Sequence, residues 1–308
     1  MNYEIIIEST CDLNAELRNK YHIYKEAIRG LVYIPGKEDM YADLEFKNYS
    51  PEEFFKLVKA NAGKVHTAFG PYEEFARVVE PVLKEGKDAI VITISTGVSG
   101  TYNGFLNWAN IMLEDYPERK ITIIDSLRYS SASGLLAIYA AQNRDNGMSY
   151  EENVAWLNQY RHHIHEAGPM DDLSFLARNG RISATKAFFG KLAGVQPFAD
   201  FTRDGKSAPL GTFKGEKKVN DASLQYVLKM ATDLDNQIVI ISHSARKERA
   251  ELFKEQLLKV AHPKEVIITS VGESTGPNVG PGLCAYFFMG EAIQEGREKE
   301  IKVYESLK

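Results

Sequence analysis

The sequence predicts an α/β protein of two domains, whose N-terminal parallel sheet is covered by helices on both faces. Short apolar stretches such as Ala89–Ile94 and Ile121–Ile124 are typical of strands buried on both sides. Stretches with helical periodicity separate them, as expected for strands joined by crossover helices. A chain of 308 residues is long for one hydrophobic core, so we place a boundary near residue 167. Residues 1–167 would form the first domain, and residues 168–308 a smaller α/β domain.

The first domain begins with an apolar strand at Tyr3–Ile7, and its helices are expected where apolar residues recur at offsets of three and four. The clearest stripe lies in Tyr72–Glu85 and consists of Phe75, Val78, Val79, Val82 and Leu83. The other expected helices are Leu13–Tyr21, Pro51–Ala60, Phe105–Leu113, Ser131–Gln142 and Tyr150–Glu166. Residues 30–50 predict a strand followed by a loop.

The pattern becomes more varied after Gly168-Pro169. A polar hairpin is expected at Phe198–Pro209, with Asp204-Gly205 as its turn. The other expected elements are helices at Thr185–Leu192, Asn220–Thr232 and Ala245–Val260, and strands at Gln237–Ser242, Glu265–Val271 and Leu283–Met289. The glycine-rich segment Gly276–Gly282 is either a rigid turn or a place where the backbone approaches a ligand closely.

Composition and charge argue against several classes of function. The chain has 37 Lys and Arg residues against 42 Asp and Glu residues, and its net charge of -5 would not attract nucleic acid. The short basic clusters Lys214–Lys218 and Arg246–Arg249 are typical of solvated faces. No apolar stretch reaches the roughly 20 residues of a spanning helix, so no integral membrane segment is expected. The first residues lack the pattern of a signal peptide, and we therefore expect a cytoplasmic protein.

No metal site is expected from the cysteines and histidines. The two cysteines, Cys11 and Cys284, are far apart in the sequence and belong to no C-x-x-C motif. His162, His163 and His165 lie close together, but a zinc ion needs three or four converging ligands with a supporting environment. Cys11 is interpreted as a small buried thiol.

Hydroxyl side chains directly follow three of the expected strands. These positions are Ser9-Thr10, Ser95-Thr96 and Ser126. The carboxyl ends of parallel strands meet at one edge of a sheet, and ligands of open α/β sheets bind there. The loop Ser95–Thr101 also leads into a helix, whose first backbone N–H groups attract anions. The pattern therefore predicts a site for an anionic ligand.

The loop Ser95–Thr101 allows more than one interpretation. The stretch 97–100 is one residue short of the G-x-S-x-G nucleophile elbow, and His243 is the histidine of the second half that directly follows a strand. The lysine followed by Ser or Thr that a phosphate-binding loop requires is missing. A purely structural turn remains possible, as does a clamp of hydroxyls and backbone N–H groups for a carboxylate or phosphate.

Six segments, taken together, resemble motifs of the DegV family of bacterial fatty-acid-binding proteins, in order along nearly the whole chain. The most specific is Ile94–Tyr102 (ISTGVSGTY), which is close to the family signature I-S-S-x-x-S-G-T-Y. The others are Glu8–Leu13 (family D-S-T-x-D-L), His66–Pro71 (T-S-Q-P), Ile123–Ser126 (V-x-D-S), Asp171–Ile182 (D-D-L-x-x-L-x-x-G-G-R-I) and Asn278–Gly282 (H-x-G-P-G).

The resemblance implies a two-domain DegV-like fold with one long-chain fatty acid in a buried tunnel and no other cofactor. Residues of the motifs would clamp the fatty-acid carboxylate: Thr67, Ser95, Thr96, Ser99 and Asn278. The inner apolar stripes would line the tunnel, and the candidates are Phe105, Leu106, Leu135, Phe175 and Leu176.

The resemblance also implies a partner, because some family members are the lipid-carrying subunit of a two-component fatty acid kinase. A separate ATP-binding subunit would phosphorylate the bound carboxylate, and this chain would be a carrier without enzymatic activity of its own. Arg181 would serve kinase docking or phosphoryl transfer, and Lys214, Lys217 and Lys218 fall roughly where the family has a basic run. The alternative from another functional class is a serine-dependent hydrolase or acyltransferase that acts on a lipid ester.

Departures from the family motifs change the expected clamp. Asn278 stands where the family has a histidine, so a group that carries or transfers a proton is missing there. His66 directly precedes Thr67, and the hypothesis that follows is that His66 replaces the missing imidazole. Phe69 and Gly70 stand where the family has glutamine and proline, and Glu8 stands where it has aspartate.

Overall fold

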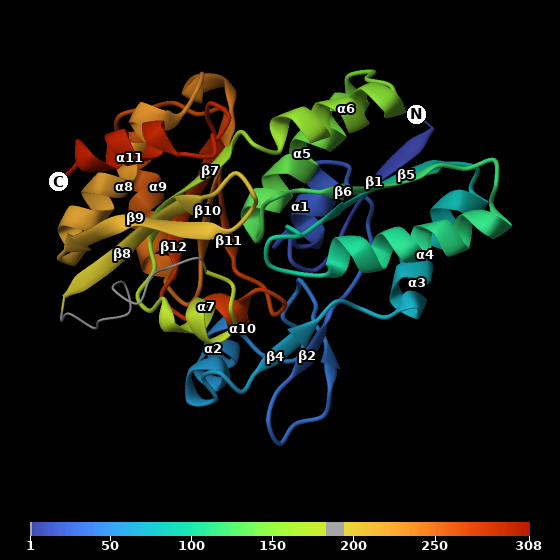
Figure 1. Cartoon of the computed structure of the whole chain (residues 1–308), viewed down its shortest axis with the longest axis horizontal. Helices are drawn as coiled ribbons and strands as arrows, with labels where there is room; N and C mark the ends of the chain where they lie inside the picture. Colours follow the sequence, from blue (N-terminus) through green and yellow to red (C-terminus); the bar gives the residue numbers. More distant parts are fainter. Residues whose placement is uncertain (1, 183–193) are drawn as a thin grey trace.

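The computed structural model describes residues 2–182 and 194–308 (Figure 1). The expected helix Thr185–Leu192 lies outside the described residues. The elements of the first half are β1 (Tyr3–Ile7), α1 (Ala15–Lys20), β2 (Leu31–Tyr33), β3 (Met40–Tyr41), α2 (Pro51–Ala60), β4 (His66–Ala68), α3 (Tyr72–Lys84), β5 (Asp88–Thr93), α4 (Thr101–Asp115), β6 (Ile121–Asp125), α5 (Ser131–Asp145) and α6 (Tyr150–Tyr160).

The second half contains the remaining described elements. They are β7 (Ile164–Pro169), α7 (Ser174–Arg178), β8 (Val195–Phe201), β9 (Ser207–Lys214), α8 (Glu216–Met230), the 3-10 helix η2 (Leu234–Asn236), β10 (Ile238–His243), α9 (Lys247–Leu258), β11 (Glu265–Ser270), α10 (Gly276–Val279), β12 (Cys284–Met289) and α11 (Glu298–Glu305). Within the two described ranges, no helix has the length and apolar character that a bilayer crossing requires.

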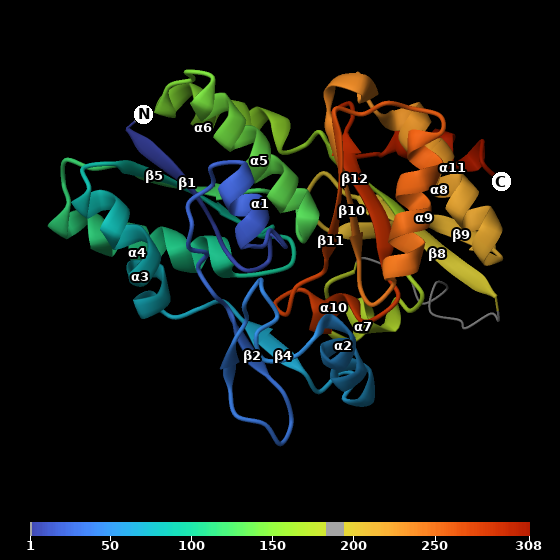
Figure 2. The same ribbon diagram turned by 180° about the vertical axis from the view of Figure 1, so that it is seen from behind.

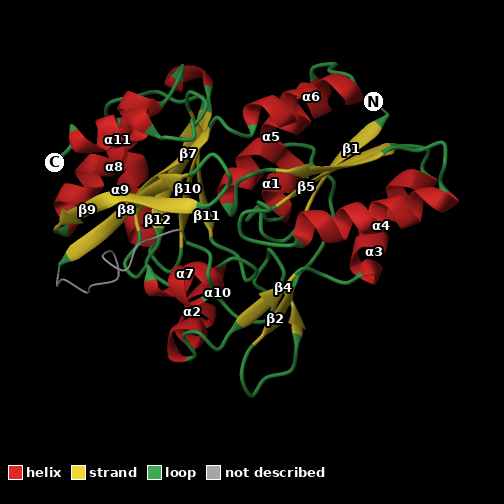
Figure 3. Cartoon of the chain, in the orientation of Figure 1, coloured by secondary structure: helices red, strands yellow, loops and turns green. Residues whose placement is uncertain are grey.

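The first sheet is three-stranded and parallel, with the strand order β1-β5-β6. Successive side chains of a strand point to opposite faces, so Ile6 and Val91 pack against α3 and α4, whereas Ile5 and Ile90 face the core that contains α5. Figure 3 shows α3 and α4 below this sheet and α5 and α6 above it. The predicted parallel sheet with helices on both faces is confirmed.

The second sheet has six strands in the order β11-β10-β12-β7-β8-β9. Only β10 and β11 pair in parallel; the other neighbours are antiparallel. Helices α8 and α9 cover one face of this sheet (Figure 2). The hairpin predicted around Asp204-Gly205 is confirmed, because β8 and β9 pair from Phe201 and Ser207 outward, and Gly205 adopts a φ of 78° in the turn.

Helix α5 lies between the two sheets and packs against strands of both. Its N-terminal part is buried on every side, which its small residues allow. A Cβ atom on Gly134 would lie 2.4 Å from the carbonyl oxygen of Cys11, so this helix approaches the end of β1 too closely for any larger residue. The close approach fixes the loop after β1 against the helix.

A third, antiparallel sheet of order β3-β2-β4 lies beneath the first two, next to α2, α7 and α10 (Figure 1). The expected strand in residues 30–50 is therefore present as β2, but the expected loop contains the short partner β3. Helix α2 begins with a capping box, in which Ser50 and Glu53 satisfy each other's backbone N–H groups. Because β4 belongs to this sheet, its residue Thr67 lies beside the first sheet.

The expected helix Tyr150–Glu166 is wrong after Tyr160. Residues from Ile164 form β7, which is buried along its whole length and pairs with β12 and β8. Pairing in the second sheet therefore overrides the helical pattern of the preceding residues. Strand β7 spans residue 167, so the second sheet already includes residues before the boundary that we expected.

Candidate ligand-binding site

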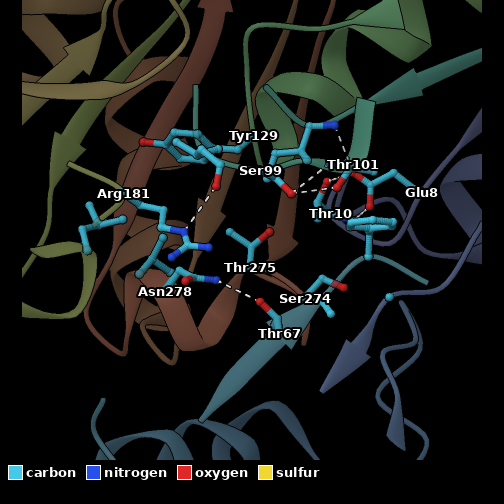
Figure 4. A pocket seen from close by; sticks show the side chains of 17 residues that line it. Glu8, Thr10, Thr67, Ser99, Thr101, Tyr129, Arg181, Ser274, Thr275 and Asn278 are labelled. Atoms are coloured by element: carbon cyan, nitrogen blue, oxygen red, sulfur yellow. Dashed lines mark hydrogen bonds between the residues drawn. The ribbon is translucent and has the colours of Figure 1, made fainter. Parts of the chain in front are cut away.

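A cavity lies at the carboxyl ends of β1 and β5, where the first sheet meets β4 and the segment around α10 (Figure 4). It contains about 640 Å³ of empty space, counting the part open to solvent. Hydroxyl side chains dominate its polar lining: Thr10, Thr67, Ser99, Thr101, Ser274 and Thr275. Glu8, Arg181 and Asn278 add charged and amide groups, and the apolar lining includes Ile94, Val98, Leu176 and Val279.

One wall of the cavity is the loop after β5 together with the start of α4. The Oγ of Ser99 lies 2.8 Å from the Oγ1 of Thr101 and accepts a hydrogen bond from the Thr101 backbone N–H at 3.3 Å. Helix α4 has 15 residues, and its N-cap, Gly100, provides no side-chain hydrogen bond. The first turn of α4 therefore adds the partial positive charge of a helix N-terminus to this wall.

The facing wall joins segments that are far apart in the sequence. Asn278 in α10 donates a hydrogen bond from Nδ2 to the Oγ1 of Thr67 in β4 at 3.3 Å. Two residues that the motifs predict for the carboxylate clamp are thus in contact across 211 positions of sequence. Figure 4 shows both side chains at the lower edge of the cavity, with Thr275 above them.

Arg181 is the one cationic side chain among the described residues that line the cavity. Its Nε donates to the carbonyl oxygen of Val98 at 3.2 Å, and its Nη1 donates to the carbonyl oxygen of Asn179. No described acidic side chain forms an ion pair with it. A half-buried guanidinium held by neutral carbonyls keeps its positive charge available to an anionic ligand.

Glu8 brings a carboxyl group to the opposite end of the cavity. Burial raises the pKa of Glu8, although the side-chain hydroxyl of Thr10 and two backbone N–H groups donate to it. The backbone donors belong to Thr10, at 3.2 Å, and to Ile94, at 3.0 Å. Since its oxygens already have partners, Glu8 holds the loop after β1 against the end of β5.

Ser95 and Thr96 do not line the cavity, although they follow β5 directly. The Oγ of Ser95 accepts from the Gly97 N–H at 3.0 Å, and a Cβ on Gly205 of the β8–β9 turn would lie only 2.1 Å from it. The Oγ1 of Thr96 donates to the carboxylate of Asp125 at 2.5 Å. The Ser95 hydroxyl therefore stabilises its own turn and the Thr96 hydroxyl fixes the loop to Asp125, whereas Ser99 is the predicted serine that reaches the cavity.

His66 does not line the cavity either. In β4, its side chain is exposed and points to the face opposite to that of Thr67, because adjacent residues of a strand alternate. The structure therefore gives no support to the hypothesis that His66 replaces the histidine missing at Asn278. No histidine is present among the described lining residues.

The predicted tunnel residues separate into three groups. Leu176 lines the cavity. Phe105, Leu135 and Phe175 are buried in the surrounding cores, and the Phe175 ring packs directly on Gly280. Leu106 is 38% exposed on the outer side of α4. The prediction that it faces inward is therefore wrong, although its neighbour Phe105 is buried.

The residues expected to contact a partner protein lie in two different places. Arg181 lies at the cavity, whereas Lys214, Lys217 and Lys218 line a surface groove at the start of α8. The cationic groups implied by the resemblance therefore occupy two distinct places.

The arrangement required for serine catalysis is not assembled around the loop. Ser99 is bonded to Thr101 and not to an imidazole. His243 lies at the end of β10 and accepts, through Nδ1, a bond from the Arg246 N–H at 3.4 Å, and it does not line the cavity. The geometry of the described residues thus gives no support to a nucleophile with a matched base.

Several lining residues were not anticipated from the sequence. Ser274 and Thr275 follow β11 just as Ser9 and Thr10 follow β1, so hydroxyls after a further expected strand were an available signal. Tyr129 could not be found this way, because its ring reaches the cavity from the loop between β6 and α5. Its hydroxyl donates to Glu166 at 3.3 Å, on the side away from the cavity.

The fold and the site together define a class: an α/β protein of three sheets, with a polar, donor-rich cavity at the carboxyl ends of parallel strands. A family model described as "Uncharacterised protein, DegV family" matches residues 2–291. The chain therefore belongs to the DegV family.

Known relatives agree with this assignment. A DegV domain-containing protein of Streptococcus pyogenes serotype M3 is 28% identical over 291 residues, which cover 94% of this chain and 99% of the relative. A solved structure of DegV from Bacillus subtilis, described as a fatty acid binding protein, has a TM-score of 0.78 at 24% identity and covers 94% of this chain and 100% of that one. A stearic acid-binding protein from Eubacterium ventriosum has a TM-score of 0.81 at 24% identity, with coverages of 94% and 98%. These likenesses confirm the fold.

Proposed function

We propose that this protein binds one long-chain fatty acid and that the cavity holds its carboxylate. The observation that carries the proposal is the convergence on one side of the cavity of Arg181, which has no described acidic partner, with the side chains of Asn278 and Thr67. The solved relatives from B. subtilis and E. ventriosum, which are described as binding a fatty acid and stearic acid, support the same class of ligand.

A carboxylate transferred from water into a protein needs donors, because a buried charge without partners is strongly unfavourable. The hydroxyl of Ser99 and the first turn of α4 would supply them from one wall, and Thr67 and Asn278 from the other. Arg181 would balance the charge. This division of labour requires no imidazole, in agreement with the absence of histidine from the described lining.

The acyl chain would run from the polar end along Leu176 and Val279 toward the core between the two sheets. Each buried methylene contributes about 0.8 kcal/mol, so a chain of about 16 carbons contributes roughly 12 kcal/mol before the costs of association. Lost freedom of the ligand and of the pocket removes several kcal/mol of this, roughly 4–15 in different treatments. At the lower end of these costs about 8 kcal/mol remains, which corresponds to a dissociation constant in the micromolar range.

The same geometry would suit presentation of the carboxylate to a separate ATP-binding kinase. Arg181 is half-buried, so one side of the guanidinium would remain accessible to a partner that approaches the cavity. The lysine groove at the start of α8 would offer a second, separate contact for such a partner.

The test is mass spectrometry of lipid extracted from the purified protein, followed by titration of the delipidated protein with palmitic acid. We expect a co-purified fatty acid at up to one molecule per chain, and saturable binding of palmitate. Absence of both would overturn the proposal. Turnover of a generic ester that Ser99→Ala abolishes would instead favour the hydrolase alternative.

A further inference from the structure

We infer that Thr275 is an additional ligand-binding residue that donates a hydrogen bond to the carboxylate, and that a chain of hydroxyls through Ser274 and Ser9 adds a second donor. This inference rests on the proposed fatty-acid site and extends it to the segment between β11 and α10. Neither Thr275 nor Ser274 is among the residues that the sequence resemblance assigns to the clamp.

Thr275 carries the first part of the argument. Its side chain is 96% buried, it lines the cavity, and its Oγ1 has no hydrogen-bond partner among the residues of 2–182 and 194–308. A threonine just before a helix commonly accepts a bond from the first turn, but here no such bond forms. A buried hydroxyl without a partner is unfavourable, so its persistence at a cavity wall points to a partner supplied by the ligand.

Ser274 carries the second part. Its Oγ lies 2.6 Å from the Oγ of Ser9, which in turn accepts the backbone N–H of Gly30 at 2.9 Å. Each hydroxyl has a single proton. If Ser9 donates to Ser274, the proton of Ser274 is free to point into the cavity. An anion in the cavity selects this direction, because the opposite one would aim a lone pair of Ser274 at a negative charge.

The chemistry of the cavity identifies the ligand group. Thr275, Ser274 and Asn278 come from one segment, and Arg181 lies at the same cavity. Donors beside a cation recognise an acceptor that carries negative charge, which a carboxylate does and an alcohol does not. Ser9 does not line the cavity, so it acts through Ser274 and is a positioning residue.

The first test compares Thr275→Val with Thr275→Ser, using palmitic acid and 1-hexadecanol as probes for the delipidated protein. Valine keeps the shape of threonine and removes the hydroxyl, whereas serine keeps it. We expect Thr275→Val to bind palmitate about 10-fold to 100-fold more weakly, the effect of losing a hydrogen bond to a charged group. Hexadecanol binding should fall several-fold less, and Thr275→Ser should stay within about 3-fold of the wild type for palmitate.

The stability of the ligand-free protein should change in the opposite direction to the affinity for palmitate. Removal of an unpaired buried hydroxyl should raise the melting temperature of Thr275→Val by about 2–4 °C, since the variant loses an unfavourable group. A purely structural threonine would lower the melting temperature instead. Equal losses for the two probes, or palmitate binding by Thr275→Val equal to that of the wild type, would overturn the role of Thr275.

The second test is Ser9→Ala with the same two probes. We expect about 3-fold to 10-fold weaker binding of palmitate and little change for hexadecanol, because Ser274 then loses the donor that orients it. Unchanged palmitate binding would overturn the hydroxyl chain. A wild-type protein that binds neither probe would refute the proposed fatty-acid site itself, which is a different result from a variant that matches a binding wild type.

Discussion

Two polar clusters meet at Tyr129, and they differ in how their groups are paired. On the cavity side, Arg181 has no acidic partner and the Thr275 hydroxyl has no hydrogen-bond partner among the described residues. On the other side lies the Asp200 network, a fully buried set of bonded side chains that consists of His165, Glu166, Asp200, Ser207 and Tyr226. The comparison indicates that paired buried groups hold the second sheet together, whereas the cavity retains polar groups without such partners, as the proposed ligand site requires.

Asp200 is the centre of the paired cluster. Its carboxylate accepts from His165 Nδ1 at 2.7 Å, from the Tyr226 hydroxyl at 2.8 Å and from the Glu166 backbone N–H at 2.9 Å. Burial by itself would raise the pKa of Asp200, but the His165 imidazole and the other donors hold it below its usual value. The network thus stabilises an ionised carboxylate in the interior.

The largest expected effect is on stability, from Asp200→Ala. This variant removes the acceptor of three buried hydrogen bonds, from His165, Tyr226 and the Glu166 backbone, so the free energy of unfolding should fall by about 3–5 kcal/mol. Urea denaturation measures it, with Asp204→Ala as the control, because Asp204 is an exposed turn residue paired with Lys206. If the two variants lose similar stability, the Asp200 network is not the structural centre that we describe.

The next effect is a dependence of stability on pH through Glu166. Burial, opposed by the Ser207 hydroxyl, raises the pKa of Glu166 from 4.5 to about 7 in the folded protein. The folded state therefore binds its proton more tightly than the unfolded state, and this contribution to stability is complete below about pH 4.5. It is lost as the pH rises toward 7, by about 3 kcal/mol at about 1.4 kcal/mol per pK unit.

Glu166→Gln should remove this component, because glutamine does not titrate. Urea denaturation at pH 5 and pH 8 should then show a smaller loss of stability in the variant than in the wild type. Asp12 and Glu273, whose pKa values burial also raises to about 7, keep part of the slope in both proteins. Parallel pH profiles for the two proteins would contradict the assignment to Glu166.

A third effect tests the unpaired side of the comparison. Arg181→Ala should weaken palmitate binding about 10-fold to 100-fold, as expected for the loss of a charge-assisted bond. Because Arg181 makes no ion pair with a described acidic residue, its removal should change the free energy of unfolding by less than about 1 kcal/mol. Arg178→Ala is the matched control, since Arg178 is exposed and lies outside this cavity. A large loss of stability without loss of affinity would reverse our interpretation of Arg181.

The smallest effects distinguish neighbouring residues of β4 and α10. Thr67→Val and Asn278→Ala should each weaken palmitate binding about 2-fold to 10-fold, less than Thr275→Val, because the two side chains bond to each other and each variant leaves the other as a donor to the carboxylate. His66→Ala should change it by less than about 2-fold, because the His66 side chain is exposed on the opposite face of β4. Isothermal titration calorimetry of the three variants with palmitate tests this prediction. If His66→Ala lost more affinity than Asn278→Ala, the hypothesis that the His66 imidazole binds the carboxylate would be supported instead.

Much of the fold followed from local patterns. The stripe of α3, the apolar strands of the first sheet and the hairpin around Asp204-Gly205 are all present, because each depends on neighbours along the chain. The strand β7 was missed because its partners, β12 and β8, are distant in sequence. Long-range pairing is invisible to a window of a few residues.

The candidate site was likewise predictable only in part. Hydroxyls at strand ends predicted the edge of the sheet where the cavity lies, and the motifs predicted Thr67, Ser99 and Asn278 for the carboxylate clamp. Arg181, which the motifs predicted for kinase docking or phosphoryl transfer, lines the same cavity. Which hydroxyls of the loop 95–101 face the cavity was not predictable. Ser95 and Thr96 bond to their own turn and to Asp125, whereas Ser99 faces inward.

The sequence by itself determined the class of fold, the parallel sheet and the hydroxyl side chains at the carboxyl edge of that sheet, because periodicity and residue type are local properties. Only the tertiary structure decided which polar groups at the cavity lack a partner: the Thr275 hydroxyl has no described hydrogen-bond partner and Arg181 has no described acidic partner, whereas the hydroxyls of Ser95 and Thr96 are bonded. Whether a polar group is satisfied depends on atoms contributed by distant segments, and the folded chain alone brings those atoms within hydrogen-bond distance.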